Sequence, residues 1–208
     1  MPEKPAPRLR ADAARNSRRI VEAAHAAFRR DGLDVQLDEV AAAAGVSVAT
    51  LYRRFANKEE LVKAVLERQF GEFVAPAIER ALAERDPRQA VIIALEAALS
   101  VASQEHCTLA AASDAGAMTL DLAGRFFEPL GELIRRGQET GVFRADLTPD
   151  DTPRLILMVL GTVTSFRPGE DGWRRYLGVL LDGLSPEGAS PLPPVTPIRD
   201  RHAPFGSC

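Results

Sequence analysis

Apolar residues recur at helical spacing along most of the chain. Over residues 11–30, apolar side chains fall three or four positions apart, which places them on one face of a helix. Gly32 follows this segment and suits the left-handed residue that ends a helix. Shorter helices are predicted over residues 37–44 and 48–55, with Gly45 between them. No stretch alternates apolar and polar residues as a strand does, so the predicted fold class is all-α.

The helical pattern continues through the rest of the chain. A long helix is predicted over residues 58–84, interrupted at Gly71 and at Pro76, because proline removes a backbone hydrogen bond. The segment after Asp86 and Pro87 is apolar on most sides and is expected to be a central, buried helix. Further helices are predicted over residues 119–140, with a proline at position 129, over residues 153–166 and over residues 171–184.

The three N-terminal helices have the order of a helix-turn-helix domain. The alanines of residues 41–44 permit two helices to cross closely, and Gly45 gives the backbone freedom that a tight turn needs. Ser47 suits the N-cap of the helix that follows, because its hydroxyl can accept hydrogen bonds from the first amides. Asn57 and Glu60 have the spacing of a capping box at the start of the next helix.

The helix after Ser47 is expected to present a polar surface. Val46, Leu51 and Phe55 are expected to face inward, the last two being four residues apart on one face. The other positions carry hydroxyl, phenol and guanidinium groups, which suit a phosphate backbone and the floor of a DNA groove. These positions are Ser47, Ala49, Thr50, Tyr52, Arg53 and Arg54, and Lys58 lies at the start of the next helix. Arginines on a short exposed helix are more often simply solvated, so charge alone does not establish DNA binding.

Composition restricts the functional classes further. The chain is 46% apolar and 26% charged, which is ordinary for a soluble globular protein. No apolar run has the length of a membrane-spanning helix, and the N-terminus lacks the apolar core of a secretory signal. Cys107 and Cys208 are the two cysteines, so no disulfide framework is predicted and a cytoplasmic location is expected.

The net charge of −3 is unevenly distributed. Residues 1–60 contain 11 Lys/Arg and 9 Asp/Glu, whereas residues 61–208 contain 15 and 20. This distribution permits a small DNA-facing end on an acidic body.

The segment "QLDEVAAAAGVSVATLYRRFANKEELVKAV" resembles the DNA-binding segment of the TetR family of bacterial transcriptional regulators. The matching features are the alanine-glycine-valine-serine turn, the run from Thr50 to Tyr52, Phe55, and Lys58 followed by acidic residues and Leu61. The resemblance extends over about residues 15–65. It implies an all-helical homodimer that represses genes at a palindromic operator in double-stranded DNA until a small molecule binds its larger domain.

The resemblance also implies roles for single residues. The positions of Ala49 and Thr50 lie near bases in the family, and those of Tyr52, Arg54 and Lys58 contact phosphates. Three departures from the family pattern are Arg54 in place of the commoner histidine, Gln36 in place of a capping threonine, and the acidic pair Asp38 and Glu39 early in the second helix.

The remaining chain resembles, more weakly, the C-terminal domains of actinobacterial, SbtR-like members of the family. The dimer interface is expected on the last two helices, at Leu155, Met158, Val159, Thr162, Phe166, Trp173, Leu177, Leu180 and Leu181. An apolar effector pocket is expected at Phe70, Phe73, Met118, Leu122, Phe126 and Phe127. Ordinary core packing is the alternative explanation for both sets of residues.

Four parts of the chain are therefore predicted. They are a flexible tail over residues 1–9, a helix-turn-helix DNA-binding domain over 10–57, a helical ligand-binding and dimerisation domain over 58–184, and a disordered tail over 185–208.

Other functional classes predict features that the sequence does not offer. His106 and Cys107 are adjacent, but a metal site or a thiol nucleophile needs further partners, so no metal, cofactor or catalytic role is predicted. An all-helical enzyme would need a polar constellation in the larger domain, and a protein–protein adaptor would have no need of Tyr52, Arg54 and Lys58. A DNA-binding regulator or activator without an effector is distinguished less well by the sequence.

Overall fold

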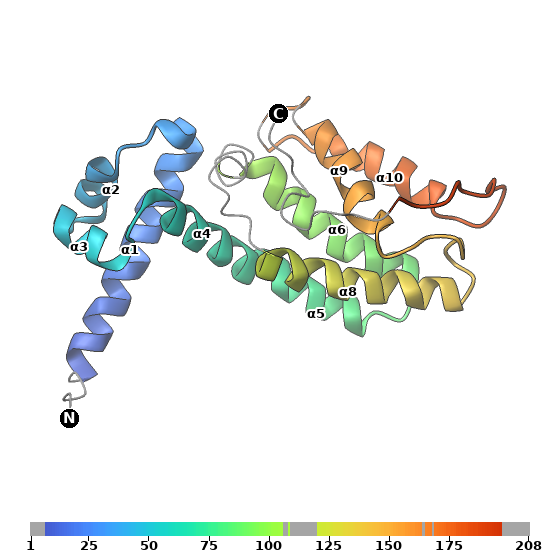
Figure 1. Ribbon diagram of the computed structural model, residues 1–208, viewed down its shortest axis with the longest axis horizontal. Helices are drawn as coiled ribbons and strands as arrows, with labels where there is room; N and C mark the ends of the chain where they lie inside the picture. Colours follow the sequence, from blue (N-terminus) through green and yellow to red (C-terminus); the bar gives the residue numbers. More distant parts are fainter. Residues whose placement is uncertain (1–6, 106–107, 109–119, 164, 168, 197–208) are drawn as a thin grey trace. The chain divides into compact units, whose positions relative to one another are not determined.

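The protein is helical throughout the part that the structure describes (Figure 1). The computed structural model describes residues 7–105, 108, 120–163, 165–167 and 169–196. The helices are α1 (Pro7–Asp31), the 3₁₀ turn η1 (Gly32–Asp34), α2 (Leu37–Ala44), α3 (Val48–Arg54), α4 (Lys58–Gln69), the π-helix η2 (Phe70–Val74), α5 (Ala75–Ala83), α6 (Pro87–Gln104), α8 (Leu120–Glu139), α9 (Asp151–Val163) and α10 (Trp173–Gly183). The predicted all-α class is confirmed. Among these helices, none combines the length and hydropathy that a membrane crossing requires.

The chain folds as two compact units. The first contains α1, α2, α3 and α4 up to Arg68, and the second contains the described residues from Gln69 onward apart from residue 108. The sequence predicts a domain boundary before Lys58. In the structure α4 belongs to the first unit as far as Arg68, and its apolar residues Leu61 and Val62 are fully buried.

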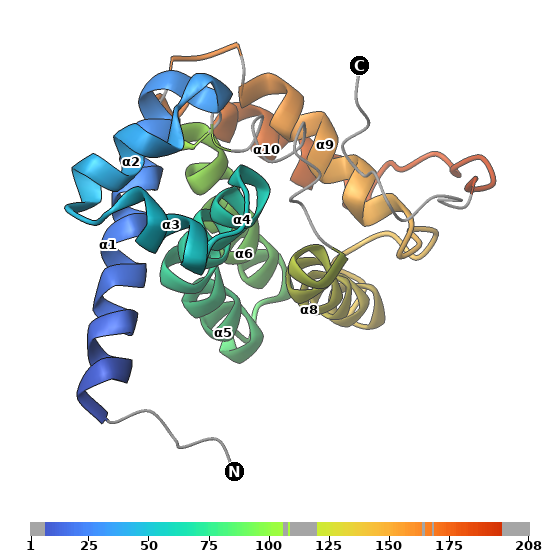
Figure 2. The ribbon, with the colours of Figure 1, turned by 60° about the vertical axis from the view of Figure 1, so that its left-hand side comes forward.

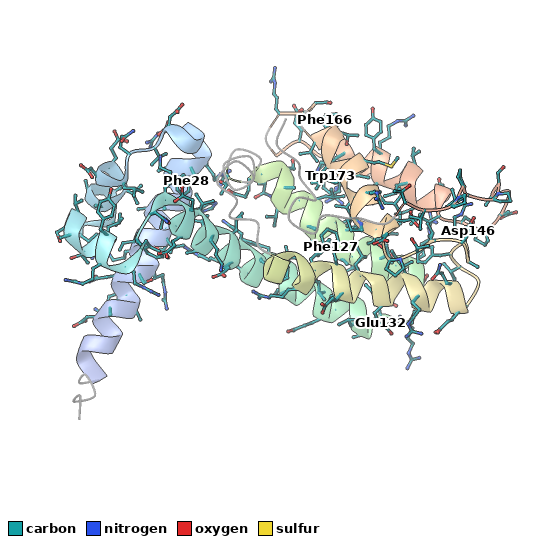
Figure 3. All side chains as sticks on the ribbon, in the orientation of Figure 1. Phe28, Phe127, Glu132, Asp146, Phe166 and Trp173 are labelled. Carbon is teal, nitrogen blue, oxygen red and sulfur yellow. The ribbon has the colours of Figure 1, made fainter. Side chains whose placement is uncertain are left out.

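The core of the first unit forms where α1, α2 and α3 bring their apolar faces together. Ile20 and Phe28 of α1 are fully buried, and Phe28 is labelled in Figure 3. Val40 of α2 and Leu51 of α3 are also fully buried, and Phe55 is nearly so. Burial of these side chains confirms the predicted spacing and provides most of the stability of such short helices.

Two glycines end helices in this unit. Gly32 follows α1 with a φ of 58°, and Gly45 follows α2 with a φ of 63°. The amide of Gly45 donates to the carbonyl of Ala42, and the amide of Val46 donates to that of Ala41, so the last carbonyls of α2 are satisfied. The guanidinium of Arg19 occupies the space that a side chain at position 45 would need.

The second unit is arranged around α6. In Figure 1, α6 lies between the pair α5 and α8 and the pair α9 and α10, and it contacts all four. Asp86 caps α6 by accepting from the amides of Arg88 and Gln89, and Pro87 is its first residue. Val91 and Leu99 are buried on α6, which confirms the predicted central helix.

The long helix predicted over residues 58–84 is interrupted where the sequence indicated. It passes through the π-helix η2, which contains Gly71, and α5 then begins with Pro76 in its first turn. Proline has no amide hydrogen, so the regular hydrogen bonding of the preceding turn cannot continue, and a wider turn accommodates the change.

The C-terminal helices are shorter than predicted. α9 ends at Val163, so Phe166 lies outside it, and α10 begins at Trp173. Residues 185–196, which were expected to be disordered, form no regular helix or strand but are hydrogen-bonded to the second unit. The amide of Leu192 donates to Asp146, and the guanidinium of Arg154 donates to the carbonyl of Thr196. Residues 197–208 lie outside the described part of the chain.

Asp146 keeps its charge in this contact. The side chain of Arg144 and the amide of Leu192 both donate to the carboxylate of Asp146 and hold its pKa well below the usual range. The sequence alone did not indicate this attachment, because it joins residues more than forty positions apart.

Two glycines in α8 should respond oppositely to alanine. A methyl group at Gly137 would overlap the buried ring of Phe143, whereas one at Gly131 would meet nothing within 4 Å. Gly137→Ala should therefore destabilise the protein by about 1–3 kcal/mol through overpacking. Gly131→Ala should stabilise it by up to about 1 kcal/mol through helix propensity. Urea unfolding of both variants measures the difference, and equal shifts in their midpoints would contradict the packing assigned to Phe143.

Candidate nucleic-acid interface

The start of α3 is fixed by Ser47. Its backbone is extended, with a φ of −71° and a ψ of 150°, and its Oγ accepts from the amide of Thr50 at 3.2 Å. The hydroxyls of Ser47 and Thr50 are also 2.8 Å apart. The predicted N-cap is confirmed, and the two hydroxyls proposed to face DNA hold each other in place before any DNA binds.

The outer face of α3 is exposed. The side chain of Tyr52 is 48% exposed, and Ala49, Arg53 and Arg54 are exposed as well. Thr50 is half-buried. A short helix that buries one apolar face and presents a phenol and guanidinium groups on the other has the form of a recognition helix.

Arg54 is anchored to α1. Its Nε donates to the hydroxyl of Ser17 at 3.1 Å, and its guanidinium carbon lies 5.4 Å from the centre of the Phe55 ring. Ser17 is not among the residues that the sequence predicts for the site. It lies 37 residues from Arg54, and no local pattern relates the two. The contact fixes a guanidinium that would otherwise lose conformational entropy on binding phosphate.

The start of α4 is fixed directly after α3. Asn57 accepts from the amide of Glu60 at 2.9 Å, and the carboxylate of Glu60 accepts from the amide of Ala56 at 2.8 Å. Lys58 is the first residue of α4 and is half-buried. The predicted cap by Asn57 is confirmed, and the reciprocal bond reaches one residue further back than in a standard capping box.

The second helix begins without a side-chain cap. The amide of the Gln36 side chain donates to the carbonyl of Asp34 at 3.3 Å instead of receiving a bond from α2. Gln36, which stands in place of the family's threonine, therefore does not cap α2. Asp38 and Glu39 are exposed in the first turn of α2, where they favour the helix dipole.

Of the residues predicted to form an effector pocket, the structure describes the side chains of the four phenylalanines. Phe126 is buried in the core of the second unit, and Phe70 and Phe127 pack against that core. Phe73 is 51% exposed. A groove of about 510 Å³ in this unit lies elsewhere, between residues 146–154 and 192–196. Met118 and the side chain of Leu122 lie outside the described part of the chain.

The two rings at 126 and 127 instead interact with each other. Their centroids are 5.4 Å apart in an edge-to-face arrangement. Arg125 lies 4.6 Å above the ring of Phe70. These contacts are those of a packed core, which was the alternative explanation of the aromatic residues.

The residues predicted to form a dimer interface fall into two groups. Val159, Trp173, Leu177 and Leu181 are buried within a single chain, and Figure 3 labels Trp173 among the side chains of the second unit. These four belong to the core because they lie on the inner faces of α9 and α10. The others are at least partly accessible, and they are Leu155, Met158, Thr162, Phe166 and Leu180.

Two exposed residues on the outer face of α10 were missed. Tyr176 is 44% exposed and Val179 is 64% exposed, and Met158 of α9 is 67% exposed. Helical spacing in the sequence could have indicated them. Positions 176 and 179 are three apart and lie on a different side of the helix from positions 173, 177 and 181, which are buried. A count of apolar residues per helix does not separate the inner from the outer face.

The described residues contain no group of three or more His, Cys, Asp or Glu side chains that could hold a metal ion. His106 and Cys107 lie outside the described part of the chain.

Comparisons with known proteins agree with this arrangement. Residues 20–65 match the protein family described as "Bacterial regulatory proteins, tetR family". An HTH-type transcriptional regulator of Staphylococcus aureus is 34% identical over 67 residues, which are 32% of this chain and 36% of that protein. The match thus spans little more than a third of the length of such curated regulators.

Two solved structures match over most of the chain. The TetR transcription regulatory protein from Mycobacterium vanbaalenii is 31% identical, with a TM-score of 0.54, over 85% of this chain and 99% of that one. The TetR family regulator PfmR from Thermus thermophilus is 28% identical, with a TM-score of 0.61, over 81% and 96% of the two chains.

The fold and the exposed helix α3 define a helix-turn-helix transcriptional regulator. The chain belongs to the TetR family of DNA-binding transcriptional regulators. The predictions of a regulator rather than an enzyme, and of this family, are confirmed.

The cap of α3 generates a test of its stability. Ser47→Ala removes the acceptor for the amide of Thr50 and should cost about 1 kcal/mol. Ser47→Asn keeps an acceptor and should leave stability nearly unchanged. Chemical unfolding of the two variants measures the cost, and identical midpoints for Ser47→Ala and the parent would show that the cap does not stabilise α3.

Proposed function

We propose that the protein is a cytoplasmic repressor that binds a palindromic operator as a homodimer and is released by a small apolar molecule bound in the second unit. Membership of the TetR family supports the general form of this proposal. The main observation in support of DNA recognition is the exposed face of α3. This helix is capped by Ser47 and is hydrogen-bonded to α1 through Arg54.

In this proposal the contacts of α3 divide by chemistry. Ala49 permits close approach to base edges, and Thr50 offers a hydroxyl and a methyl group that can read a base in the major groove. Phosphates are bound by Ser47, Tyr52, Arg53, Arg54 and Lys58. Arg54 suits this role because its Nε is already held, and Lys58 suits it because the first amides of α4 add to its charge.

We assign dimerisation to the outer faces of α9 and α10. Met158, Tyr176 and Val179 are large apolar or aromatic side chains that a single chain leaves exposed, and the partly accessible Leu155 and Leu180 lie on the same two helices. A two-fold axis there would present two α3 helices to one face of DNA, and successive major grooves are about 34–36 Å apart.

We assign release to the passage from α4 to α5. α4 begins beside the recognition helix at Lys58, and its far end is followed by η2, whose Phe70 packs against the core of the second unit. π-helical turns often mark functional sites in helices. A ligand that prefers one tilt of this helix would change the spacing of the two α3 helices, and operator and ligand would then oppose each other.

Selection of bound DNA from a random pool should recover a palindrome. On that operator, Arg54→Ala and Lys58→Ala should weaken binding of all sequences alike and lower the slope of log affinity against log salt by about 1 per lost contact. Thr50→Val should instead alter preference at one base pair by about 1–3 kcal/mol. Fluorescence anisotropy measures all three, and unchanged affinity for both charge variants would contradict the assignment of α3.

The dimer assignment has its own test. Met158→Glu combined with Val179→Glu places charge in the proposed interface and should weaken association by about 2 kcal/mol or more. Leu82→Glu changes an exposed apolar residue on α5, outside the assigned surface, and should leave association unchanged. Analytical ultracentrifugation compares them, and equal association constants for the double variant and the parent would place the interface elsewhere.

A further inference from the structure

The positive charge of the first unit is concentrated at its N-terminal end. Residues 1–19 contain six Lys/Arg and two Asp/Glu, whereas residues 20–60 contain five Lys/Arg and seven Asp/Glu. The segment that includes α2 and α3 is therefore net acidic, although it is the part that resembles a DNA-binding domain. Residues 37–54, which form α2, α3 and their turn, carry two Asp/Glu and two Arg and are neutral, so the excess of positive charge that attracts DNA phosphates lies in residues 1–19.

The N-terminal part of α1 extends beyond the rest of this unit. In Figures 1 and 2, the first turns of α1 project past α2 and α3. Ser17 marks the point at which α1 meets Arg54 of α3. Residues 7–16 lie on the N-terminal side of that point, and ten helical residues are about 15 Å long.

Residues 12–19 of α1 are not held by a hydrophobic core. Residues 12–15, 18 and 19 are exposed and residues 16 and 17 are half-buried, so none of residues 12–19 is buried. A helical segment without a buried side chain gains little from packing. Its exposed arginines include Arg15, whose side chain is 69% accessible, and Arg18. Arg8 and Arg10 add two further charges by sequence.

We propose that residues 12–19, the basic extension, bind the phosphate backbone of duplex DNA that flanks the bases read by α3. This inference rests on the proposed DNA recognition by α3. Duplex DNA carries one negative charge per about 1.7 Å, so a basic helix of this length can reach several phosphates. The anchor between Ser17 and Arg54 places the base of the extension beside a residue that itself binds phosphate in the proposal.

Asp12 limits this attraction in the free protein. Its carboxylate pairs with Arg15 at 3.1 Å, and both side chains are more than 60% exposed. An exposed pair of this kind is weak, so a DNA phosphate can displace Asp12. Within the described residues, the structure gives Arg18 no carboxylate partner, which leaves its charge available to DNA.

The decisive experiment compares two duplexes containing the selected operator. One is trimmed to the base pairs read by the two α3 helices, and the other extends by about ten base pairs on each side. Arg15→Ala combined with Arg18→Ala should lower affinity for the long duplex about tenfold or more at 0.15 M salt. The slope of log affinity against log salt concentration should fall by about 2 per protomer. Affinity for the trimmed duplex should stay at the parental value.

Asp12→Asn should change the affinity for DNA in the opposite direction. It removes the carboxylate that competes for Arg15 and should tighten binding to the long duplex. A matched control is Arg80→Ala combined with Arg85→Ala, which removes two exposed arginines from the second unit and should leave affinity and salt slope unchanged. Alanine favours helix, so the Arg15 and Arg18 substitutions preserve α1.

The proposal is overturned if the Arg15 and Arg18 double variant keeps parental affinity and salt slope on the long duplex, or if it loses affinity equally on both duplexes. Failure of DNA recognition by α3 has a different result. In that case the parent selects no sequence, and Arg54→Ala has no effect on either duplex. If only the basic extension is wrong, the effect of Arg54→Ala remains.

Discussion

A helix of seven residues is too short to be stable in isolation, so the proposed DNA surface depends on contacts that fix both ends of α3. Ser47 caps its first turn, and Gly45 provides the left-handed turn that precedes it. At the other end, Arg54 is bonded to Ser17 and Leu51 is fully buried. Tyr52 and its exposed neighbours therefore project from a rigid support, which lowers the entropy lost when they bind.

Charge divides the first unit into two functional parts. The helix-turn-helix segment, residues 37–54, offers shape and hydrogen bonds and is neutral overall, and the N-terminal part of α1 holds the excess of positive charge. Contacts to phosphate provide affinity and contacts to bases provide specificity. In this account Thr50 of α3 reads bases, and the phosphate contacts are shared by α3 and the N-terminal part of α1, which the bond between Ser17 and Arg54 joins.

The sequence predicted the features that local chemistry determines. The bounds of α2, the cap at Ser47, the turn at Gly45 and the interruption near Pro76 all follow from residues within a few positions of one another. Features that join distant residues were missed. The bond from Arg54 to Ser17 and the attachment of residues 185–196 depend on tertiary packing, which no local pattern encodes.

Apolar side chains were the least predictable part of the candidate sites. Trp173 and Leu177 were assigned to an interface, and the structure buries them in the core of one chain. Met158 and Val179, on the same two helices, are exposed. Composition shows that a helix is apolar, but only the position of its neighbours decides which face meets another chain.

The central claim is that residues 47–58 contact DNA. Amide hydrogen exchange of the full chain, with and without the selected operator, tests it most directly. The account predicts slower exchange for residues 47–58 in the complex. Unchanged exchange there, together with protection confined to the second unit, would contradict it.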